Sequence, residues 1–272
     1  MAAERRIGGA TRLAGVIGWP VAHSRSPRMH NAAYTKLGMD WAYVAMPVAP
    51  ERLEQALRGI GALGFAGVNV TIPHKRATAG LCDELSPAAM RAGSVNTVLV
   101  GGDGSLRGET TDGPGMLDAI GEPPSGEALV LGGGGAARAA AVALRDAGMR
   151  VSVAARRSDA AAELAGELQI EAAPWPPASA PALLVNATPV GQAGAAGELP
   201  VPESLLDGVE VVCDLAYRGD GAETGLITAA RTRRLRAVDG LDVLVGQGAI
   251  AFRLLTGLPA PVAAMQAAVR QG

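Results

Sequence analysis

Residues 128–138 read Ala128-Leu129-Val130-Leu131-Gly132-Gly133-Gly134-Gly135-Ala136-Ala137-Arg138, the pattern of a short buried strand, a glycine turn and an alanine-rich helix that ends at Gly148. Glycines at 132 and 134 allow a tight turn and close backbone approach, and the small Ala137 lets the helix touch the strand. The helix N-terminus favours a pyrophosphate. Because the next strand, expected over residues 150–154, arrives where a βαβ unit requires it, this stretch predicts a dinucleotide-binding unit.

The residues after that second strand indicate which dinucleotide is expected. Ala155-Arg156-Arg157 stands where NAD-binding proteins usually carry an Asp or Glu for the ribose hydroxyls. Two guanidinium groups and no acid favour a 2′-phosphate, because arginine bonds phosphate in a bidentate way and can also stack on adenine. Two solvated surface arginines without a ligand are the alternative. We expect NADP, held by Arg156 and Arg157.

Upstream of this unit, the apolar spacing alternates between the periods of strands and helices. We expect strands over residues 13–18, 41–46 and 66–71, and helices over 26–37 and 50–62. Residues 97–100 and 106–108 flank Gly101-Gly102-Asp103-Gly104, which is a hairpin signal. A helix is expected over 113–120, followed by the linker-like Glu122-Pro123-Pro124-Ser125-Gly126. The alternation implies βαβ units and an α/β fold with a largely parallel sheet.

A second candidate site lies in the first half of the chain, in Asn69-Val70-Thr71-Ile72-Pro73-His74-Lys75. Pro73 cannot donate to a strand ladder and should end the strand, so Thr71 and Lys75 project beyond its carboxyl end, where open α/β sheets bind ligands. The pKa of a lysine moves readily on desolvation, which suits it to proton transfer near neutral pH. A surface loop with a solvated lysine is the alternative.

Composition limits the class of protein. The 272 residues are 49% apolar and 18% charged, with a formal net charge of -2, which favours neither disorder nor a nucleic-acid surface. Cys82 and Cys213 lie far apart without CxxC spacing, and no secretory signal or long apolar run occurs, so we expect a cytoplasmic protein without a membrane partner. The histidines lack helical metal-ligand spacing, and no metal is assigned. A small-molecule protein fits best.

Further strand ends should line the same crevice as the glycine turn. A strand over residues 183–185 runs into Asn186-Ala187-Thr188-Pro189-Val190-Gly191, and one over 209–215 ends in Tyr217. The chain closes with Gly240-Leu241-Asp242-Val243-Leu244-Val245-Gly246-Gln247 and an apolar helix expected over about 247–256.

Taken together, these motifs resemble the shikimate dehydrogenase family. Gly18-Trp19-Pro20-Val21-Ala22-His23-Ser24-Arg25-Ser26-Pro27 matches the opening motif of that family, in which two serines hold the shikimate carboxylate. The resemblance implies this role for Ser24 and Ser26, and the start of a helix also favours an anion. A serine that only caps the helix is the alternative.

The same resemblance implies the remaining substrate contacts. Residues 69–75 match the central motif, so Asn69 and Thr71 would bond ring hydroxyls and Lys75 would be the catalytic lysine. Gly93-Ser94-Val95-Asn96-Thr97 gives Asn96 as another ring contact, and Gly108-Glu109-Thr110-Thr111-Asp112 gives Asp112 as the partner of Lys75. Thr110 departs from the pattern, because the family commonly has Asn there. On the substrate side the resemblance also includes Tyr217 and Gln247.

On the cofactor side the resemblance covers the glycine turn and the ends of three strands. The cofactor-binding residues that it implies are Gly132, Gly134, Gly135, Ala136, Arg156, Arg157, Thr188 and Gly240. Departures are more numerous here. The family often has Asn-Arg-Thr at 155–157, Met at the position of Gln192, and proline at that of Gly219. Phosphate binding through Arg156 should survive these changes.

The implied reaction is the reversible NADPH-dependent reduction of 3-dehydroshikimate to shikimate. The order of the motifs implies two domains: a discontinuous substrate-binding α/β domain, residues 1–112 completed by 241–272, and an inserted Rossmann-type dinucleotide-binding domain, residues 113–240. The active site would be the cleft between them. A quinate/shikimate or aminoshikimate dehydrogenase with relaxed cofactor use remains open, as does a non-catalytic NADP-binding sensor; a folate-type dehydrogenase is remote. A monomer and a homodimer are both compatible with the sequence.

Overall fold

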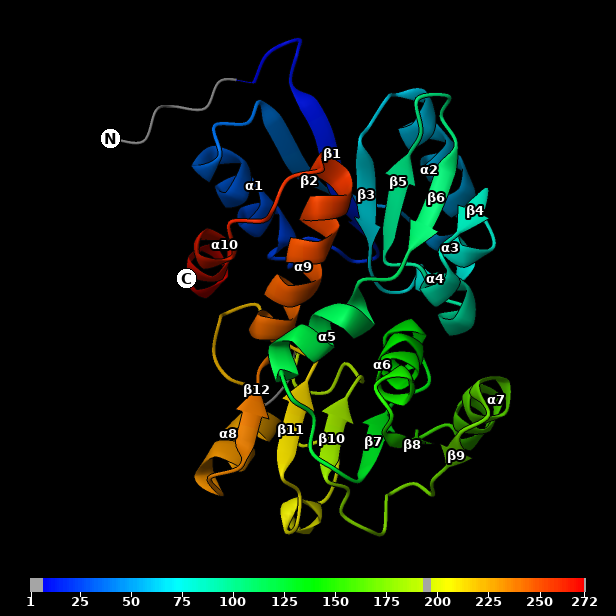
Figure 1. Ribbon diagram of the computed structural model, residues 1–272, viewed down its shortest axis with the longest axis vertical. Coiled ribbons are helices and arrows are strands. Elements are labelled where there is room, and N and C mark those ends of the chain that lie inside the picture. The colour runs from blue at the N-terminus through cyan, green and yellow to red at the C-terminus, as the bar shows by residue number, and fades with distance from the viewer. Residues whose placement is uncertain (1–6, 193–196, 272) are drawn as a thin grey trace. The chain divides into compact units, whose positions relative to one another are not determined.

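The computed structural model describes residues 7–192 and 197–271 (Figure 1). It is an α/β protein with two six-stranded sheets. The chain divides into two compact units, each with one of the sheets. The first unit comprises the described residues up to Met90, Ser94–Thr111 and Gly248–Gln271, and the second comprises Arg91–Gly93 and Asp112–Gln247.

The sheet of the first unit has the order β2-β1-β3-β5-β6-β4. The first three strands are parallel, β5 is antiparallel to both of its neighbours, and β4 pairs parallel to β6. The hairpin expected around Gly101–Gly104 is therefore β5 and β6. The strands are β1 (Arg12–Gly18), β2 (Trp41–Pro47), β3 (Gly67–Val70), β4 (Glu84–Leu85), β5 (Thr97–Val100) and β6 (Leu106–Glu109).

Helices cover both faces of this sheet. Val68 packs in a core cluster with Leu57 of α2, whereas a Cβ on the preceding Gly67 would lie 2.6 Å from a side-chain atom of Leu255 in α9. Because successive strand residues face opposite sides, α2 and α9 lie on opposite faces. The helical segments of this unit are α1 (Ser26–Lys36), η1 (Pro50–Arg52), α2 (Leu53–Ala62), α3 (Lys75–Ala79), most of α4 (Pro87–Ala92), the C-terminal part of α9 (Gly240–Thr256) and α10 (Val262–Arg270).

A side chain of α1 hydrogen-bonds the backbone of the edge strand β2. Asn31 of α1 donates from Nδ2 to the carbonyl oxygen of Tyr43 at 2.8 Å, and its Oδ1 accepts from the amide of Tyr43 at 3.0 Å. These two bonds copy those that a neighbouring strand would make. In this way the middle of β2 is satisfied on the side away from β1.

The sheet of the second unit is entirely parallel, with the order β12-β11-β10-β7-β8-β9 (Figure 1). Numbered within the unit this is 6-5-4-1-2-3, the order of doubly wound dinucleotide-binding folds. The order reverses between β7 and β10, and ligands bind at the carboxyl ends of strands beside such a point. The strands are β7 (Glu127–Leu131), β8 (Arg150–Ala154), β9 (Glu171–Ala172), β10 (Leu183–Asn186), β11 (Val211–Asp214) and β12 (Arg236–Val238).

Both faces of this second sheet are buried. Ala128 and Val130 of β7 belong to one core cluster, and Leu129 and Leu131 belong to another. A strand covered on both sides explains the uninterrupted apolar run of residues 128–131. The helical segments of the unit are α5 (Asp112–Ile120), α6 (Gly135–Asp146), α7 (Ser158–Leu168), η2 (Glu203–Leu206), α8 (Gly225–Thr232) and the first part of α9.

The structure differs from the sequence-based expectation mainly at helices. The last helix was expected from about residue 247 but begins at Gly240, because Gly246 is not a breaker: a Cβ there would lie 2.3 Å from the carbonyl oxygen of Gly115 in α5. The helix expected over 50–62 begins as the 3-10 turn η1. Elements that the sequence analysis did not anticipate are α3, α4, α7, α8, α10, η2, β4, β9 and β12.

Candidate active site

The two serines of the opening motif lie where β1 leads into α1. Ser26 is the first residue of α1 and is buried, and its amide donates to Oγ of the half-buried Ser24 at 3.3 Å. The intervening Arg25 points elsewhere, because its Nη1 donates to the carbonyl oxygen of Val269 at the end of α10. An anion in this segment would therefore meet serine hydroxyls rather than this guanidinium.

The end of β3 carries the predicted catalytic lysine. The strand ends at Val70, Thr71 follows it, and Lys75 is the first residue of the short helix α3. The turn between them is fixed by His74, which is 2% exposed and donates from Nε2 to the carbonyl oxygen of Val48 at 2.7 Å. Lys75 itself is half-buried, and its carbonyl oxygen accepts from the amide of Val95. Its amine is therefore carried on an anchored backbone at the carboxyl edge of the sheet.

The two predicted asparagine contacts are both buried: Asn69 lies in β3, and Asn96 immediately precedes the adjacent strand β5. Asn69 of β3 donates from Nδ2 to Oγ1 of Thr97 at 2.9 Å. Asn96 donates from Nδ2 to Oγ1 of Thr111 at 2.8 Å and accepts from the amide of Thr111 at 2.6 Å. The side chains are thus held in one orientation before any ligand arrives, and Asn96 fixes the residue that precedes Asp112.

In the second unit, a glycine contact brings together the helices that carry Asp112 and Gln247. Asp112 begins α5, and a carboxylate is stabilised at a helix N-terminus. A Cβ on Gly115 would lie 2.2 Å from the backbone nitrogen of Gln247 in α9, so only glycine permits this crossing. Gln247 is 9% exposed and donates from Nε2 to the carbonyl oxygen of Leu244 at 2.8 Å.

The glycine turn lies at the switch point of the parallel sheet. Gly132 has φ +122°, which favours glycine, and a Cβ there would lie 2.9 Å from the carbonyl oxygen of Ala187 after β10. A Cβ on Gly134, in contrast, would meet nothing within 4 Å. Gly135 and the half-buried Ala136 are the first residues of α6. The turn therefore has open space at its helix end, where a pyrophosphate could approach the amides.

Arg156 and Arg157 lie at the carboxyl end of β8, next to this turn. The carbonyl oxygen of Ala154, the last residue of β8, accepts from the amide of Gly132 at 2.8 Å. Both arginines are exposed, and neither forms an ion pair with a carboxylate in the described part of the chain. Two unneutralised guanidinium groups one strand away from a glycine turn suit a phosphate on the ribose.

The start of α9 packs on the loop after β11. A Cβ on Gly240 would lie 2.2 Å from the carbonyl oxygen of Ala216 and 3.1 Å from the amide nitrogen of Tyr217, so this position also requires glycine. Asp239 caps the helix by accepting from the amides of Leu241 at 2.9 Å and Asp242 at 3.0 Å.

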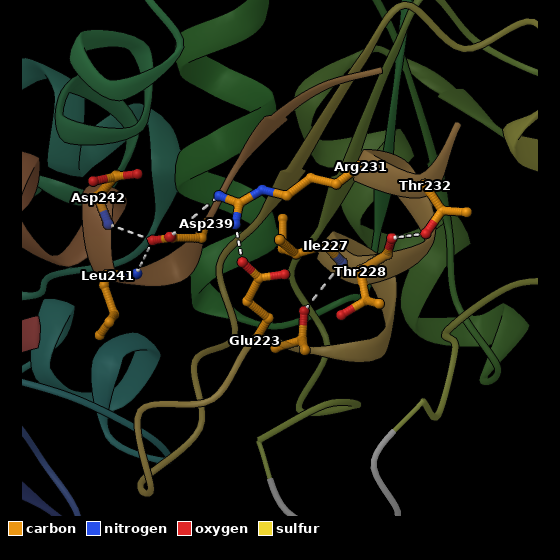
Figure 2. Close-up of polar contacts among 9 residues, drawn as sticks. Glu223, Ile227, Thr228, Arg231, Thr232, Asp239, Leu241 and Asp242 are labelled. Carbon is orange, nitrogen blue, oxygen red and sulfur yellow. Dashed lines mark hydrogen bonds and ion pairs between the residues drawn. The ribbon is translucent and has the colours of Figure 1, made fainter. Parts of the chain in front are cut away.

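Figure 2 shows the ion pairs that hold the capping residue Asp239. Arg231 of α8 forms ion pairs with Glu223 and with Asp239, the latter at 3.8 Å. The half-buried Tyr217 thus lies on a loop that the first turn of α9 covers.

Comparison with known proteins shows which family carries these motifs. Residues 16–98 match the family model "Shikimate dehydrogenase substrate binding domain", and residues 240–270 match "Shikimate 5'-dehydrogenase C-terminal domain". A shikimate dehydrogenase (NADP(+)) of Anaeromyxobacter dehalogenans (strain 2CP-C) is 48% identical over 97% of this chain and 97% of its own length. The chain belongs to the shikimate dehydrogenase family.

Solved structures agree with this assignment. Shikimate 5-dehydrogenase from Thermus thermophilus, in complex with NADP(H) and shikimate, matches with a TM-score of 0.87 and 42% identity over 96% of this chain and 99% of that chain. The ligand-free 5-ketofructose reductase of Gluconobacter sp. strain CHM43 matches with a TM-score of 0.85 and 30% identity, again over 96% and 99%. The two-domain α/β fold class expected for the shikimate dehydrogenase family is confirmed.

The second unit also contains a buried acid that the sequence did not predict. Asp214 ends β11 and is 0% exposed; its Oδ1 accepts from Nδ2 of Asn186 at 2.8 Å and from the amide of Ala216 at 2.9 Å, and its Oδ2 accepts from Oγ1 of Thr224 at 2.6 Å. Burial raises the pKa of Asp214 to about 6, although these hydrogen bonds act in the opposite direction. The one signal in the sequence that could have predicted this site is an acidic residue at the end of the otherwise apolar run Val211–Asp214.

Asn186, which Asp214 holds in place, fixes one of the predicted cofactor-binding residues, Thr188. Asn186 accepts at Oδ1 from Oγ1 of Thr188 at 2.7 Å and from its amide at 3.0 Å. Thr188 therefore has its hydroxyl hydrogen committed to Asn186, and one of its two oxygen lone pairs accepts from the amide of Val190 at 3.3 Å. Thr110, the departure from the family pattern, is buried, and its hydroxyl has no hydrogen-bond partner within the described residues.

Two further findings concern ligands and membranes. Among residues 7–192 and 197–271, no group of three or more His, Cys, Asp or Glu side chains is placed to hold a metal ion. No helix in those same ranges combines the length and apolar character needed to cross a membrane.

Proposed function

We propose that this protein is an NADP-dependent shikimate dehydrogenase, which catalyses the reversible reduction of 3-dehydroshikimate to shikimate. The single observation that carries the proposal is the 48% identity over 97% of the chain to a shikimate dehydrogenase (NADP(+)). It is supported by the placement of the motif residues at strand ends and helix starts in both units. When bound, NADP(H) supplies or accepts the hydride.

The chain's own residues handle the charge that develops on the substrate oxygen. Lys75 donates the proton to that oxygen in the direction of reduction, or takes it back in the direction of oxidation. Asp112 accepts a hydrogen bond from the same hydroxyl and orients the lysine. Asn69, Thr71 and Asn96 bond ring hydroxyls, Ser24 and Ser26 hold the carboxylate, and Tyr217 and Gln247 complete the substrate contacts.

The nucleotide is held by backbone and by arginine. Gly132, Gly134, Gly135 and Ala136 would hold its pyrophosphate, Arg156 and Arg157 would bond the 2′-phosphate, and Thr188 and Gly240 would complete the cofactor contacts. The fit rests on the open space at Gly134 and on the two guanidinium groups without a carboxylate partner among the described residues. We assign nucleotide binding to residues 113–240 and substrate binding to residues 1–112 and 241–272. A cytoplasmic monomer or homodimer is the proposed form.

A spectrophotometric assay with shikimate and NADP⁺ tests the proposal directly. Quinate, an aminoshikimate, NAD⁺ and, in the reductive direction, 5-ketofructose serve as alternative reactants; the last is included because a 5-ketofructose reductase shares this fold at 30% identity. Turnover of shikimate with NADP⁺ well above all other pairs is expected. Tight NADPH binding without turnover of any substrate would instead support a sensor.

Lys75→Ala tests the chemical role. General acid-base help is typically worth about 10² to 10⁴ in rate, so kcat should fall by about that factor while KM for shikimate changes little. Lys36→Ala is the matched control, because Lys36 is the chain's other lysine and is exposed at the end of α1. A raised KM with unchanged kcat would remove Lys75 from the chemistry.

A further inference from the structure

The side-chain amide of Asn69 is almost fully engaged inside the first unit. Its Nδ2 donates to Oγ1 of Thr97 at 2.9 Å and to the carbonyl oxygen of Asn96 at 3.2 Å, which uses both amide hydrogens. Its Oδ1 accepts from the hydroxyl of Tyr43 at 2.6 Å. Because a carbonyl oxygen can only accept, Nδ2 must face Asn96 and Oδ1 must face Tyr43. One lone pair on Oδ1 remains, so Asn69 can only accept from a ligand hydroxyl.

Two consecutive residues of α1 hold Tyr43, one by its backbone and the other by its ring. Asn31 bonds the backbone of Tyr43, as described above, and the ring of His30 stacks on the Tyr43 ring with centroids 4.3 Å apart and planes 3° apart. His30 is fully buried, and neither of its ring nitrogens has a hydrogen-bond partner in the described parts of the chain. Burial lowers the pKa of His30 to about 3, so the ring is neutral and serves as a flat packing surface.

The same polar network continues toward the residue that precedes Asp112. Oγ1 of Thr97 lies 3.4 Å from Oγ1 of Thr111, and that oxygen also accepts from Nδ2 of Asn96. Thr97 and Thr111 are 0% and 1% exposed, and Tyr43 is 2% exposed. In such a dry environment a hydrogen bond fixes orientation strongly, because a lost partner cannot be replaced by bulk water.

We infer that Tyr43 is a positioning residue for substrate recognition: stacked on His30, its hydroxyl orients the amide of Asn69 so that Oδ1 accepts a hydrogen bond from a substrate hydroxyl. The inference rests on the proposed function and extends it to a residue that does not touch substrate. It also assigns a chemical requirement, since the ring substituent that meets Asn69 must be a donor. An ether or a keto oxygen at that position is rejected.

Tyr43→Phe tests the inference in the full-length protein. One neutral hydrogen bond contributes about 0.5 to 1.5 kcal/mol, so we expect KM for shikimate to rise about three- to tenfold. Because Asn69 binds the ground and transition states alike, kcat should stay within about twofold, and KM for NADP⁺ should not change. Tyr34→Phe is the matched control: Tyr34 is equally buried in the same aromatic cluster, and its replacement leaves the bond between Tyr43 and Asn69 intact.

A double-mutant cycle separates positioning from general damage. In an Asn69→Ala background, Tyr43→Phe should have no further effect on KM, since the amide that it orients is gone. Additive effects, or a Tyr43→Phe variant that behaves like Tyr34→Phe, would overturn the inference while leaving the proposed function standing. A wild-type protein that neither turns over nor binds shikimate would overturn both.

Discussion

Replacing the buried Asp214 with Asn should change how stability depends on pH. The carboxyl group is 0% exposed and accepts hydrogen bonds from Asn186, Ala216 and Thr224. An Asn at this position keeps the shape and the Oδ1 acceptor but cannot ionise. The hydroxyl of Thr224 would then lose its acceptor, at a cost of about 1 kcal/mol that does not depend on pH.

The pH-dependent part follows from the pKa of Asp214, which burial raises from 3.8 to about 6. The folded protein therefore binds this proton more tightly than the unfolded chain does. The resulting stability is fully present below about pH 4 and is lost as the pH rises through about 6. A difference of about two pKa units corresponds to about 3 kcal/mol. Relative to the variant, the free energy of unfolding of the wild type should fall by about this amount between about pH 4 and pH 7.5.

Urea unfolding across this pH range measures the difference, with tryptophan fluorescence as the probe. Of the three tryptophans, Trp175 packs against the core cluster that contains Val212 of β11. Asp118→Asn, the same chemical change at an exposed position of α5, is the control. Parallel stability curves for wild type and Asp214→Asn would refute the reasoning. A wild type that becomes more stable relative to the variant as the pH rises would also refute it, because ionised Asp214 would then stabilise the fold.

Two further predictions concern the nucleotide side. Gly132→Ala should lower the free energy of unfolding by about 1 to 3 kcal/mol and raise KM for NADP⁺, because φ is +122° and the new Cβ would lie 2.9 Å from the carbonyl oxygen of Ala187. Thermal denaturation and initial rates test this prediction. Gly134→Ala is the control: its Cβ would meet nothing within 4 Å, so this variant should keep its stability and weaken only nucleotide binding. Arg156→Ala and Arg157→Ala should raise KM for NADP⁺ by about tenfold or more and leave KM for NAD⁺ unchanged, since a charge-assisted hydrogen bond contributes about 1.5 to 3 kcal/mol. Arg150→Ala, at the amino end of β8, is the control, and equal losses for both nucleotides would contradict a phosphate role.

The sequence predicted those features that depend on short-range pattern. The strand at 128–131, the glycine turn and the following helix were predicted because each is coded by neighbouring residues, and β7 and α6 confirm the prediction. The strand ends that carry Thr71 and Thr188 were also predicted within about one residue. Local periodicity suffices there, because an apolar run followed by a proline or a polar residue has few alternatives.

Features that depend on distant partners were not predicted. Asp214 bonds Asn186 across 28 positions, and Tyr43 bonds Asn69 across 26, so neither pairing has a local signature. The start of α9 was placed wrongly because a glycine inside a helix ordinarily signals weakness. Only the contact with Gly115 in α5 shows that Gly246 is there to let two backbones approach. The substrate and catalytic roles of the motif residues stay predictions that the variants above test.

The amide of Asn31 also bears on self-association. An unprotected strand at the border of a sheet recruits strands from other molecules, and β2 has no charged residue to discourage this. Since Asn31 already occupies the N–H and C=O of Tyr43 at the midpoint of β2, an incoming strand would have to break two bonds before it formed any there. A homodimer of this chain would therefore not be built by joining its sheets through β2.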